Sequence, residues 1–468
     1  MKTLLKSAVL LLGMGLLSTH SQAQKVVVED KEPNSVMFVT IDKAGNEIIR
    51  IMNASQSPRF HEPKAPRFLL TDRKGKFALG IGGYVKLAAE YDFGGISDNI
   101  DFYPALIPGR GQSYVRNQFQ MDATTSTIFL KLVGHTDLLG DFVVYTAGNF
   151  RGGSGKIFEL RNAYVSARGF TAGYDYGSFM DLGNVPATID FAGPNGMSIY
   201  HATQIRYEHA LAKGLKAGIG VEMPVVDGLT NEHVSIAKQR MPNFPVYVQY
   251  GWNPKSHFRA AAIIRSMTYD DLTARKAESE IGWGVLASAT FNLTNRLQVY
   301  GQGVYGKGIG QFLNDMSLLN VDVVPNPEKE GRMQVLPMMG WFAGMQYNFS
   351  PKVFITSTYG QSRLYSHDGY PAVASDQYRY GQYLNATLFW NITSDLQAGA
   401  EYLRGWRTDF NGDTRHANRV NLAVQYSFLR KNRTGCLGFL IFSPSSVNCL
   451  HRLRLPSSEI KSASDASI

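Results

Sequence analysis

From Lys76 onward, apolar and polar side chains alternate along the chain with a period of two residues. Between residues 76 and 93, most apolar side chains share one parity, whereas Lys86, Glu90 and Asp92 have the other. Such alternation is typical of a strand with one apolar and one polar face. These runs approach or exceed the ~10 residues that a tilted transmembrane strand needs. The pattern therefore predicts membrane-spanning β-strands.

The same alternation recurs to residue 428, where the last run is also the clearest. There Val420, Leu422 and Val424 oppose Arg419 and Asn421. We predict sixteen strands, with ends placed to within about two to four residues. Their ranges are 76–93, 117–134, 141–150, 157–168, 170–177, 199–209, 215–223, 245–252, 257–269, 281–291, 296–306, 337–349, 352–364, 378–391, 395–406 and 417–428. The predicted fold class is an all-β, antiparallel transmembrane barrel.

The connections between these runs support a barrel in the outer membrane. Alternate links are short and rich in Asn, Pro, Gly, Ser and Thr, as tight turns require. Most of the others are longer: 94–114, 178–198, 224–243, 307–334 and 366–376. Short periplasmic turns and long external loops are typical of outer-membrane barrels, as are aromatic residues at strand ends. Candidates for such an aromatic girdle include Tyr91, Trp252, Phe291, Phe349 and Trp390.

Composition and charge agree with this picture. The chain has 46 glycines and 24 tyrosines, and only 18% of its residues are charged, which suits strands and turns. Of the net charge of +9, residues 1–23 contribute two and residues 429–468 contribute four. The barrel region thus keeps only a small positive charge, which excludes nucleic-acid binding on the basis of charge.

The chain divides into four predicted regions. Residues 1–23 read as a signal peptide, because Lys2 and Lys6 precede an apolar run and Ser21-Gln22-Ala23 offers a cleavage site after Ala23. Residues 24–75 are interpreted as a periplasmic segment, with a hairpin over 36–51. Residues 76–428 form the barrel. These assignments place the protein in the outer membrane of a Gram-negative bacterium, in contact with lipid.

Residues 429–468 differ from the barrel in composition. They hold both cysteines, Cys436 and Cys449, many serines and no alternation. The segment is either a periplasmic extension or a non-native addition after Phe428, and we favour the second interpretation. The spacing of the cysteines and His451 matches no compact zinc pattern.

Nothing in the sequence indicates catalysis. No serine lies in a nucleophile elbow and no histidine-rich metal motif is present. His201, His209 and His257 lie at or near predicted strand ends, where solvated or girdle histidines are typical. We predict no enzymatic activity, catalytic residue, metal or cofactor.

The candidate pore-lining charges lie at the strand positions that are predicted to face inward. The basic ones are Lys86, Arg161, Arg206, Lys216, Arg259, Arg265 and Arg419, and the acidic ones are Glu90, Glu159, Glu208, Glu222 and Glu401. In the simplest interpretation they are solvated wall residues that pair across strands. In the alternative interpretation, the lumen is narrow and the summed field of these residues favours solutes of one charge sign. Seven basic against five acidic residues predicts a mild preference for anions.

The segment from Phe158 to Gly196 has a more specific pattern. It includes Arg161, Ala163, Tyr164, Phe179, Met180, Asp181, Pro186, Thr188, Asp190, Phe191, Gly193, Pro194 and Gly196. This pattern resembles the DcaP-like family of trimeric outer-membrane porins, and the turn at Leu139-Gly140-Asp141 also fits. Tyr176 and Asn149 depart from it, because the family has a tryptophan and an acidic residue at these places.

The resemblance implies a sixteen-stranded homotrimeric barrel whose pore is narrowed by an inward-folded loop, and a preference for small anionic solutes such as dicarboxylates. The constriction loop would carry Asp181, Pro186, Asp190, Phe191, Gly193 and Pro194. Its prolines would give it stiff corners, and Phe191 would anchor it against the wall. Arg161, Arg206, Arg259 and Arg265 would face the constriction.

We therefore predict a porin for passive diffusion of small polar, anionic solutes. Two alternatives come from other functional classes. One is an outer-membrane barrel enzyme, and the other is a receptor or adhesin that binds ligands through loops 94–114 and 307–334. Conductance across a planar bilayer distinguishes the porin from both.

Overall fold

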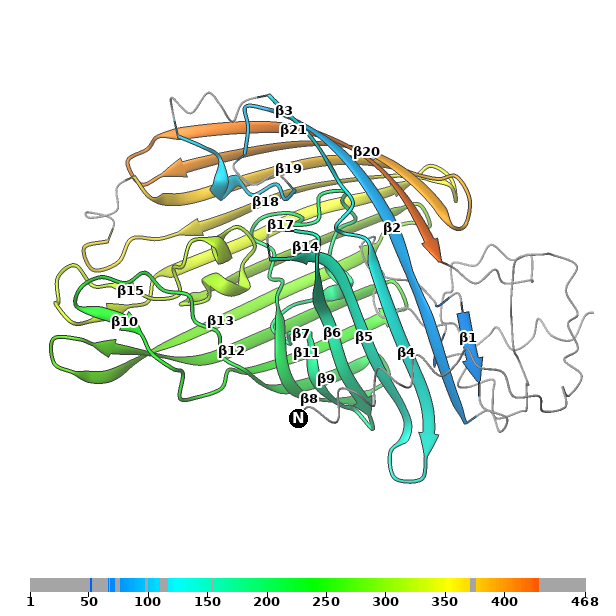
Figure 1. The fold of residues 1–468 in the computed structure, drawn as a ribbon, viewed down its shortest axis with the longest axis horizontal. Coiled ribbons are helices and arrows are strands. Elements are labelled where there is room, and N and C mark those ends of the chain that lie inside the picture. The colour runs from blue at the N-terminus through cyan, green and yellow to red at the C-terminus, as the bar shows by residue number, and fades with distance from the viewer. Residues whose placement is uncertain are drawn as a thin grey trace, which may run out of the picture. The chain divides into compact units, whose positions relative to one another are not determined.

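The computed structural model describes residues 51–52, 66, 68–71, 76–96, 100–109, 117–153, 155–370 and 376–428. Here sixteen antiparallel wall strands form a closed barrel (Figure 1). They are β2 (Phe77–Phe93), β3 with β4 (Gln118–Asp122 and Thr127–Thr136), β5 (Gly140–Gly152), β6 (Ile157–Ala167), β7 (Phe170–Tyr176), β8 (His201–Ala212), β9 (Leu215–Glu222), β11 (Phe244–Asn253), β12 (Ser256–Asp271), β13 (Lys276–Asn292), β14 (Leu297–Lys307), β17 (Pro337–Asn348), β18 (Val353–Leu364), β19 (Tyr378–Asn391), β20 (Leu396–Asp409) and β21 (Thr414–Phe428). The barrel closes where β21 pairs with β2. The predicted fold class and strand number are confirmed.

One wall strand is interrupted. β3 and β4 both pair with β2, and residues 123–126 between them leave the ladder. The Asp122 carboxylate accepts hydrogen bonds from the Thr124 amide and hydroxyl, at 2.9 and 2.7 Å. This local turn competes with strand pairing, as is common for aspartate.

The two faces of the wall follow the predicted parity. Outward apolar side chains are exposed, as at Ile205 and Leu422, which are 60% and 55% accessible. Their inward neighbours are polar or buried, and Arg419 is inaccessible. Exposed apolar residues over a whole strand surface would be unfavourable in water, so this face is the one that meets lipid. No helix in the described ranges is long and apolar enough to span a membrane.

Connections at one end of the barrel are all short, as predicted. At the other end five are long, namely 94–117, 177–200, 223–243, 308–336 and 365–377, and three are tight turns at 153–156, 272–275 and 410–413. The long ones contain the 3₁₀ helices η2 (Pro104–Leu106), η4 (Leu182–Asn184), η5 (Gly310–Phe312) and η6 (Met316–Leu318), and the short strands β10 (Val234–Ile236), β15 (Val324–Pro325) and β16 (Met333–Gln334).

A further short strand, β1 (Phe68–Thr71), lies at the seam where the barrel closes. It pairs with Ala78–Ile81 of β2. β4 pairs with one edge of these β2 residues, so β1 pairs with the opposite edge. Further along β2, that same edge pairs with β21. The β21 ladder ends with Phe428 opposite Gly83, two positions from the Phe68–Ile81 pair. β1 therefore takes over the edge of β2 where β21 stops.

The described part of the N-terminal segment touches the inner wall. Ile51 and Met52 are helical, and Met52 packs against Ala78 and Val133. The Lys131 ammonium donates to the carbonyls of Ile51 and Met52, at 2.7 and 3.4 Å. The predicted hairpin lies outside the described residues except for Ile51, as do the signal peptide and residues 429–468.

Candidate functional site

The loop of residues 177–200 enters the barrel because its wall strand is short. β7 has seven residues, whereas β6 and β8 have eleven and twelve. The chain thus leaves the wall partway along the barrel. Its next hydrogen bonds are from the Gly177 amide to the Tyr200 carbonyl and from the Ser178 amide to Glu222 of β9, and the residues that follow contact more distant strands. Three anchors hold this loop.

The first anchor is Asp181, which contacts two wall strands. Its carboxylate lies 2.8 Å from Nε2 of His257, accepts a hydrogen bond from Ser288 at 2.6 Å, and also caps the Gly183 amide at 3.0 Å. Burial alone would raise the pKa of Asp181, but the hydrogen bond and charge of His257, with the charge of Arg259, lower it below its ordinary value. The carboxylate is therefore charged at neutral pH and holds the loop entrance. His257 was expected to be a solvated or girdle residue, and this expectation was wrong.

The second anchor is the peptide between Ile189 and Asp190. Glu401 accepts hydrogen bonds from both amides, at 3.1 and 2.7 Å, and the Lys86 ammonium donates to the Ile189 carbonyl at 2.7 Å. The Asp190 carboxyl in turn accepts from the Phe102 amide and the Tyr383 hydroxyl, both at 3.1 Å. Burial, with the nearby carboxylates, raises the pKa of Asp190 well above its ordinary value.

The third anchor is the tip of the loop. The Asn314 amide nitrogen donates to the carbonyls of Ala192, Gly193 and Pro194, at 2.9, 3.1 and 3.0 Å. Gly196 lies directly on the wall, where a side chain would collide with the Gln361 carbonyl. Its φ of +75° also favours glycine.

We expect Gly196→Ala to displace the loop tip from the wall. The substitution combines a left-handed backbone conformation with a collision, and should cost at least about 1 kcal/mol. Single-channel conductance and hydrogen exchange of the loop measure the effect. Gly412→Ala is the matched control, because Gly412 has a φ of +87° but no atom within 4 Å of an added Cβ. Equal effects of both substitutions would show that the loop tip is not held by contact with the wall.

Two other loops also pack inside the barrel, in contrast to the external position predicted for them. Asp315, from the loop 308–336, accepts hydrogen bonds from the Ala105 amide and from the hydroxyls of Tyr378 and Ser362, at 2.6, 2.6 and 3.2 Å. Asp315 thereby joins the described part of the loop 94–117 to the wall. Burial raises the pKa of Asp315, although these hydrogen bonds oppose the shift.

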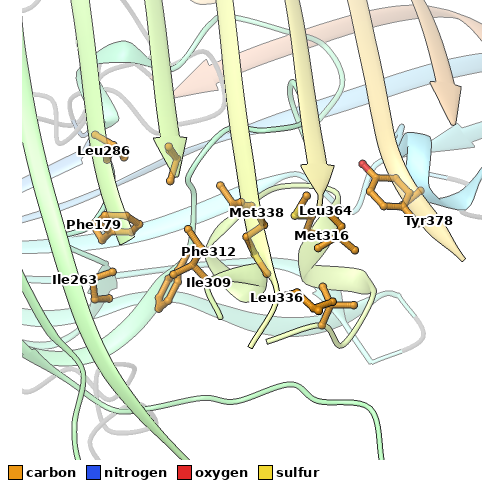
Figure 2. Close-up of a cluster of buried hydrophobic side chains, with 14 of the residues drawn as sticks. Phe179, Ile263, Leu286, Ile309, Phe312, Met316, Leu336, Met338, Leu364 and Tyr378 are labelled. Carbon is orange, nitrogen blue, oxygen red and sulfur yellow. The ribbon is translucent and has the colours of Figure 1, made fainter. Parts of the chain in front are cut away.

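These loops and the wall share an apolar cluster (Figure 2). Phe179, Ile309, Phe312, Met316 and Leu336 come from loops, and the cluster is completed from the wall by Ile263, Leu286, Met338, Leu364 and Tyr378. All of them are at most 3% accessible. Part of the lumen is therefore a packed protein interior rather than a water-filled channel.

A buried ion pair fixes the loop 308–336 beside this cluster. The guanidinium of Arg265 lies 3.1 Å from the Asp322 carboxylate, and both side chains are inaccessible. Arg265 also donates to the carbonyls of Gly308 and Val225, at 3.0 and 2.5 Å. Arg265 therefore fastens two loops to β12 and does not border an open passage.

The predicted basic residues all lie on the inner face of the wall, but they do not converge on one point. Lys86, Arg259, Arg265 and Arg419 are at most 8% accessible, and Arg419 forms a two-point ion pair with Asp92 at 2.7 and 3.0 Å. Arg259 stacks on Tyr247 at 3.6 Å. Arg161, Arg206 and Lys216 are more accessible.

A cavity of about 220 Å³ lies between the wall strands β5–β8 and the loop entrance. Its lining includes Arg206, Asp175, Tyr145, Tyr164 and Leu182. Arg206 lies 3.3 Å from the Asp175 carboxylate, so its charge is only partly open to a solute.

Phe191 marks a second basic region. Its ring lies under the guanidinium groups of Arg151 and Arg161, at 4.6 and 5.1 Å. Arg151, which was not among the predicted pore-lining residues, also forms a two-point contact with Asp101 at 3.0 and 2.5 Å. Its inward parity in β5, two residues after Asn149, was the available signal. No group of histidine, cysteine, aspartate and glutamate side chains suitable for a metal ion occurs among the described residues.

Comparisons with known proteins identify the family and the fold of the chain. The sequence pattern of the porin subfamily matches residues 77–426. The DcaP outer-membrane channel of Acinetobacter baumannii superposes with a TM-score of 0.67 at 18% identity, covering 76% of this chain and 99% of that one. An anion-selective porin from Comamonas acidovorans gives 0.48 at 13% identity, covering 75% and 99%. OmpT of Vibrio cholerae gives 0.48 at 11% identity, covering 77% and 99%. No curated protein sequence matches.

The match to the subfamily spans nearly the whole barrel, and the DcaP channel has the same fold. The resemblance found in the segment from Phe158 to Gly196 is thereby confirmed, as is the expectation of a transport protein in the outer membrane. The chain belongs to the porin subfamily, shares the fold of the DcaP channel, and is an outer-membrane channel.

Proposed function

We propose that this porin passes small polar solutes by passive diffusion and favours small anions of the dicarboxylate type. The observation that carries the proposal is the loop 177–200, which is held inside the barrel at three anchors. Two of them are on the wall, and the third lies at the loop tip between the wall and Asn314 of the loop 308–336. Together with the two other inward loops, it restricts passage to the side of the lumen formed by β5–β8. Arg161 and Arg206 of the predicted pore-lining set lie on that side, in β6 and β8. Lys216 lies on the neighbouring strand β9 and pairs with Glu208 at 2.9 Å.

The charges of the loop support an anion preference. The Asp181 carboxylate is buried against His257 and Ser288 of the wall, and the raised pKa of Asp190 favours its uncharged form. The loop thus contributes little negative potential, whereas guanidinium groups keep their charge. In a narrow passage of low dielectric, each remaining positive charge acts strongly on a solute.

We also propose that the protein is a homotrimer, as the resemblance of its Phe158–Gly196 segment to the trimeric family implies. Native mass spectrometry of the detergent-extracted protein tests this assembly. A monomer that persists across mild detergents would contradict it.

Planar-bilayer recording tests the channel itself. Stepwise current increases on insertion are expected, because a diffusion porin has a permanent passage. A protein that inserts but stays silent at all voltages would favour the enzyme or receptor alternative.

Neutralising Arg161 and Arg206 to glutamine is expected to move the reversal potential in a salt gradient toward cations. The expected change in the anion-to-cation permeability ratio is about fivefold, equivalent to about 1 kcal/mol of interaction with a permeating ion. Arg275→Gln combined with Lys329→Gln, at two exposed loop positions, is the charge-matched control. An unchanged reversal potential in the double variant would remove the basis for an anionic solute.

A further inference from the structure

Five consecutive short turns at one end of the barrel each carry one exposed basic residue. These residues, here called the basic arc, are Arg168, Lys213, Lys255, Arg296 and Lys352. They lie in the β6–β7, β8–β9, β11–β12, β13–β14 and β17–β18 turns. Pairing of β7 with β8, β9 with β11, β12 with β13, and β14 with β17 places these turns side by side around the rim.

The arc is bounded by acidic turns. On one flank the β4–β5 turn carries Asp137, and on the other the β19–β20 turn carries Asp395. Within the described part of the chain, Lys213, Arg296 and Lys352 form no ion pair. Positive charge is therefore concentrated over ten neighbouring strands of this rim.

Outward-facing aromatic residues lie next to the same turns. Phe170 follows Arg168 by two residues and packs against Tyr207 at 4.6 Å. Trp252 precedes Lys255 by three residues and packs against Phe291 at 5.3 Å.

The last turn of the arc repeats this arrangement. Phe349 precedes Lys352 by three residues and packs against Tyr347 at 5.1 Å. Phe170, Trp252, Phe291 and Phe349 are 43–54% accessible on the lipid-facing side. Aromatic rings at strand ends lie at the level of the lipid headgroups. The basic arc is consequently at headgroup depth rather than in open solution.

We propose that the basic arc binds the phosphate groups of anionic phospholipids in the periplasmic leaflet of the outer membrane. Short turns mark the periplasmic end of such barrels. Lysine and arginine stems extend along apolar surface while their charged ends reach the headgroups. Basic side chains near an anionic lipid surface attract it individually and additively. The arc would surround most of the rim with a shell rich in anionic lipid.

The test uses the full-length protein in nanodiscs of phosphatidylethanolamine mixed with phosphatidylglycerol, and measures the lipids retained on the protein by native mass spectrometry. The arc variant is Lys213→Gln, Lys255→Gln, Arg296→Gln and Lys352→Gln. Arg168 is kept because its guanidinium donates to the Asp137 carbonyl at 3.1 Å and so supports the turn. The matched control removes four exposed basic residues at the opposite rim, as Arg275→Gln, Lys276→Gln, Lys329→Gln and Arg332→Gln.

We expect the wild type and the control to retain phosphatidylglycerol in preference to phosphatidylethanolamine. In the arc variant, the ratio of retained phosphatidylglycerol to phosphatidylethanolamine should fall by at least about fivefold, which is the change expected for one basic residue at an anionic surface. High salt should weaken the preference of the wild type. Equal preference in the arc variant and the wild type, or an equal loss in both variants, would overturn the proposal. It would also be overturned if the arc variant kept its lipid preference and instead lost binding to isolated peptidoglycan.

Discussion

Asp322→Asn is expected to destabilise the packed interior of the barrel by about 3–5 kcal/mol, because it leaves the Arg265 guanidinium buried without its counter-charge. The pair is inaccessible on both sides, so water cannot compensate the lost charge. Asp322 also accepts hydrogen bonds from two backbone amides, those of Gln311 at 3.0 Å and Asp227 at 3.2 Å, one on each carboxylate oxygen. Asparagine keeps an acceptor for only one of them, so the loss combines the unpaired charge with one lost backbone hydrogen bond.

A double-mutant cycle separates this effect from loss of shape. Adding Arg265→Met to Asp322→Asn removes the unpaired charge and should recover most of the stability. Urea unfolding in lipid vesicles measures the free energy, and hydrogen exchange over residues 308–336 reports whether the loop alone detaches. If the single and double variants are equally unstable, the ion pair is not what holds this loop.

Ile205→Arg is expected to cost about 2–4 kcal/mol, because it places a charge on the lipid face near the middle of β8. Ile205 is 60% accessible on the outer surface. The next residue, Arg206, shows that the same side chain is accommodated at this depth on the inner face, where Asp175 and the Tyr176 carbonyl accept its hydrogen bonds, both at 3.3 Å. The free-energy cost of an arginine in β8 therefore depends on which face of the wall it occupies.

A refolding titration in vesicles measures this cost, and Ile205→Leu controls for the loss of the isoleucine shape. The inward positions Asn421 and Ala423 are unsuitable as controls for an arginine on the inner face, because both side chains already make contacts there. Asn421 donates to Glu401 at 2.9 Å, and Ala423 packs in an apolar cluster with Ile189. A barrel that tolerates Ile205→Arg without loss of stability would show that this face does not meet lipid.

The strands were predictable because one physical rule governs every wall position. A barrel wall in a membrane has lipid on one side and a polar or packed lumen on the other, so the parity recurs in all sixteen strands and shifts only at local bulges such as those in β5 and near the end of β11. The break between β3 and β4 escaped prediction, since the Asp122 turn uses side-chain hydrogen bonds that alternation does not report.

The destination of the long loops was only partly predictable. The inward course of the loop 177–200 was inferred from the family resemblance, and its anchors involve wall residues far away in sequence. The loop 308–336 was placed outside, although Ile309, Phe312, Leu313 and Met316 make it too apolar for a solvated loop. That apolar content was a readable signal, because external loops rarely bury such side chains.

Pairing of the inward charges could not be read from parity. Parity assigned Arg259, Arg265 and Arg419 to the lumen, but it did not say which of them meets a carboxylate. The partner of Arg265 lies on a loop 57 residues further along, and that of Arg419 lies on the first wall strand. Such contacts form only in the closed barrel. The sequence therefore predicts which residues lie on the inner face, but not which of them border the open passage.

The strand β1 limits how the barrel can close. Its hairpin with β2 joins residues only about ten positions apart, whereas β21 must find β2 across nearly the whole chain, so local pairing is favoured to form first. Once β1 is in place, a slip of β21 by two residues would bring Phe428 opposite Ile81, where Phe68 already pairs. A slip by one residue would turn every lipid-facing side chain of β21 inward. β1 thus acts as a stop that blocks the advance of the last strand toward the periplasm.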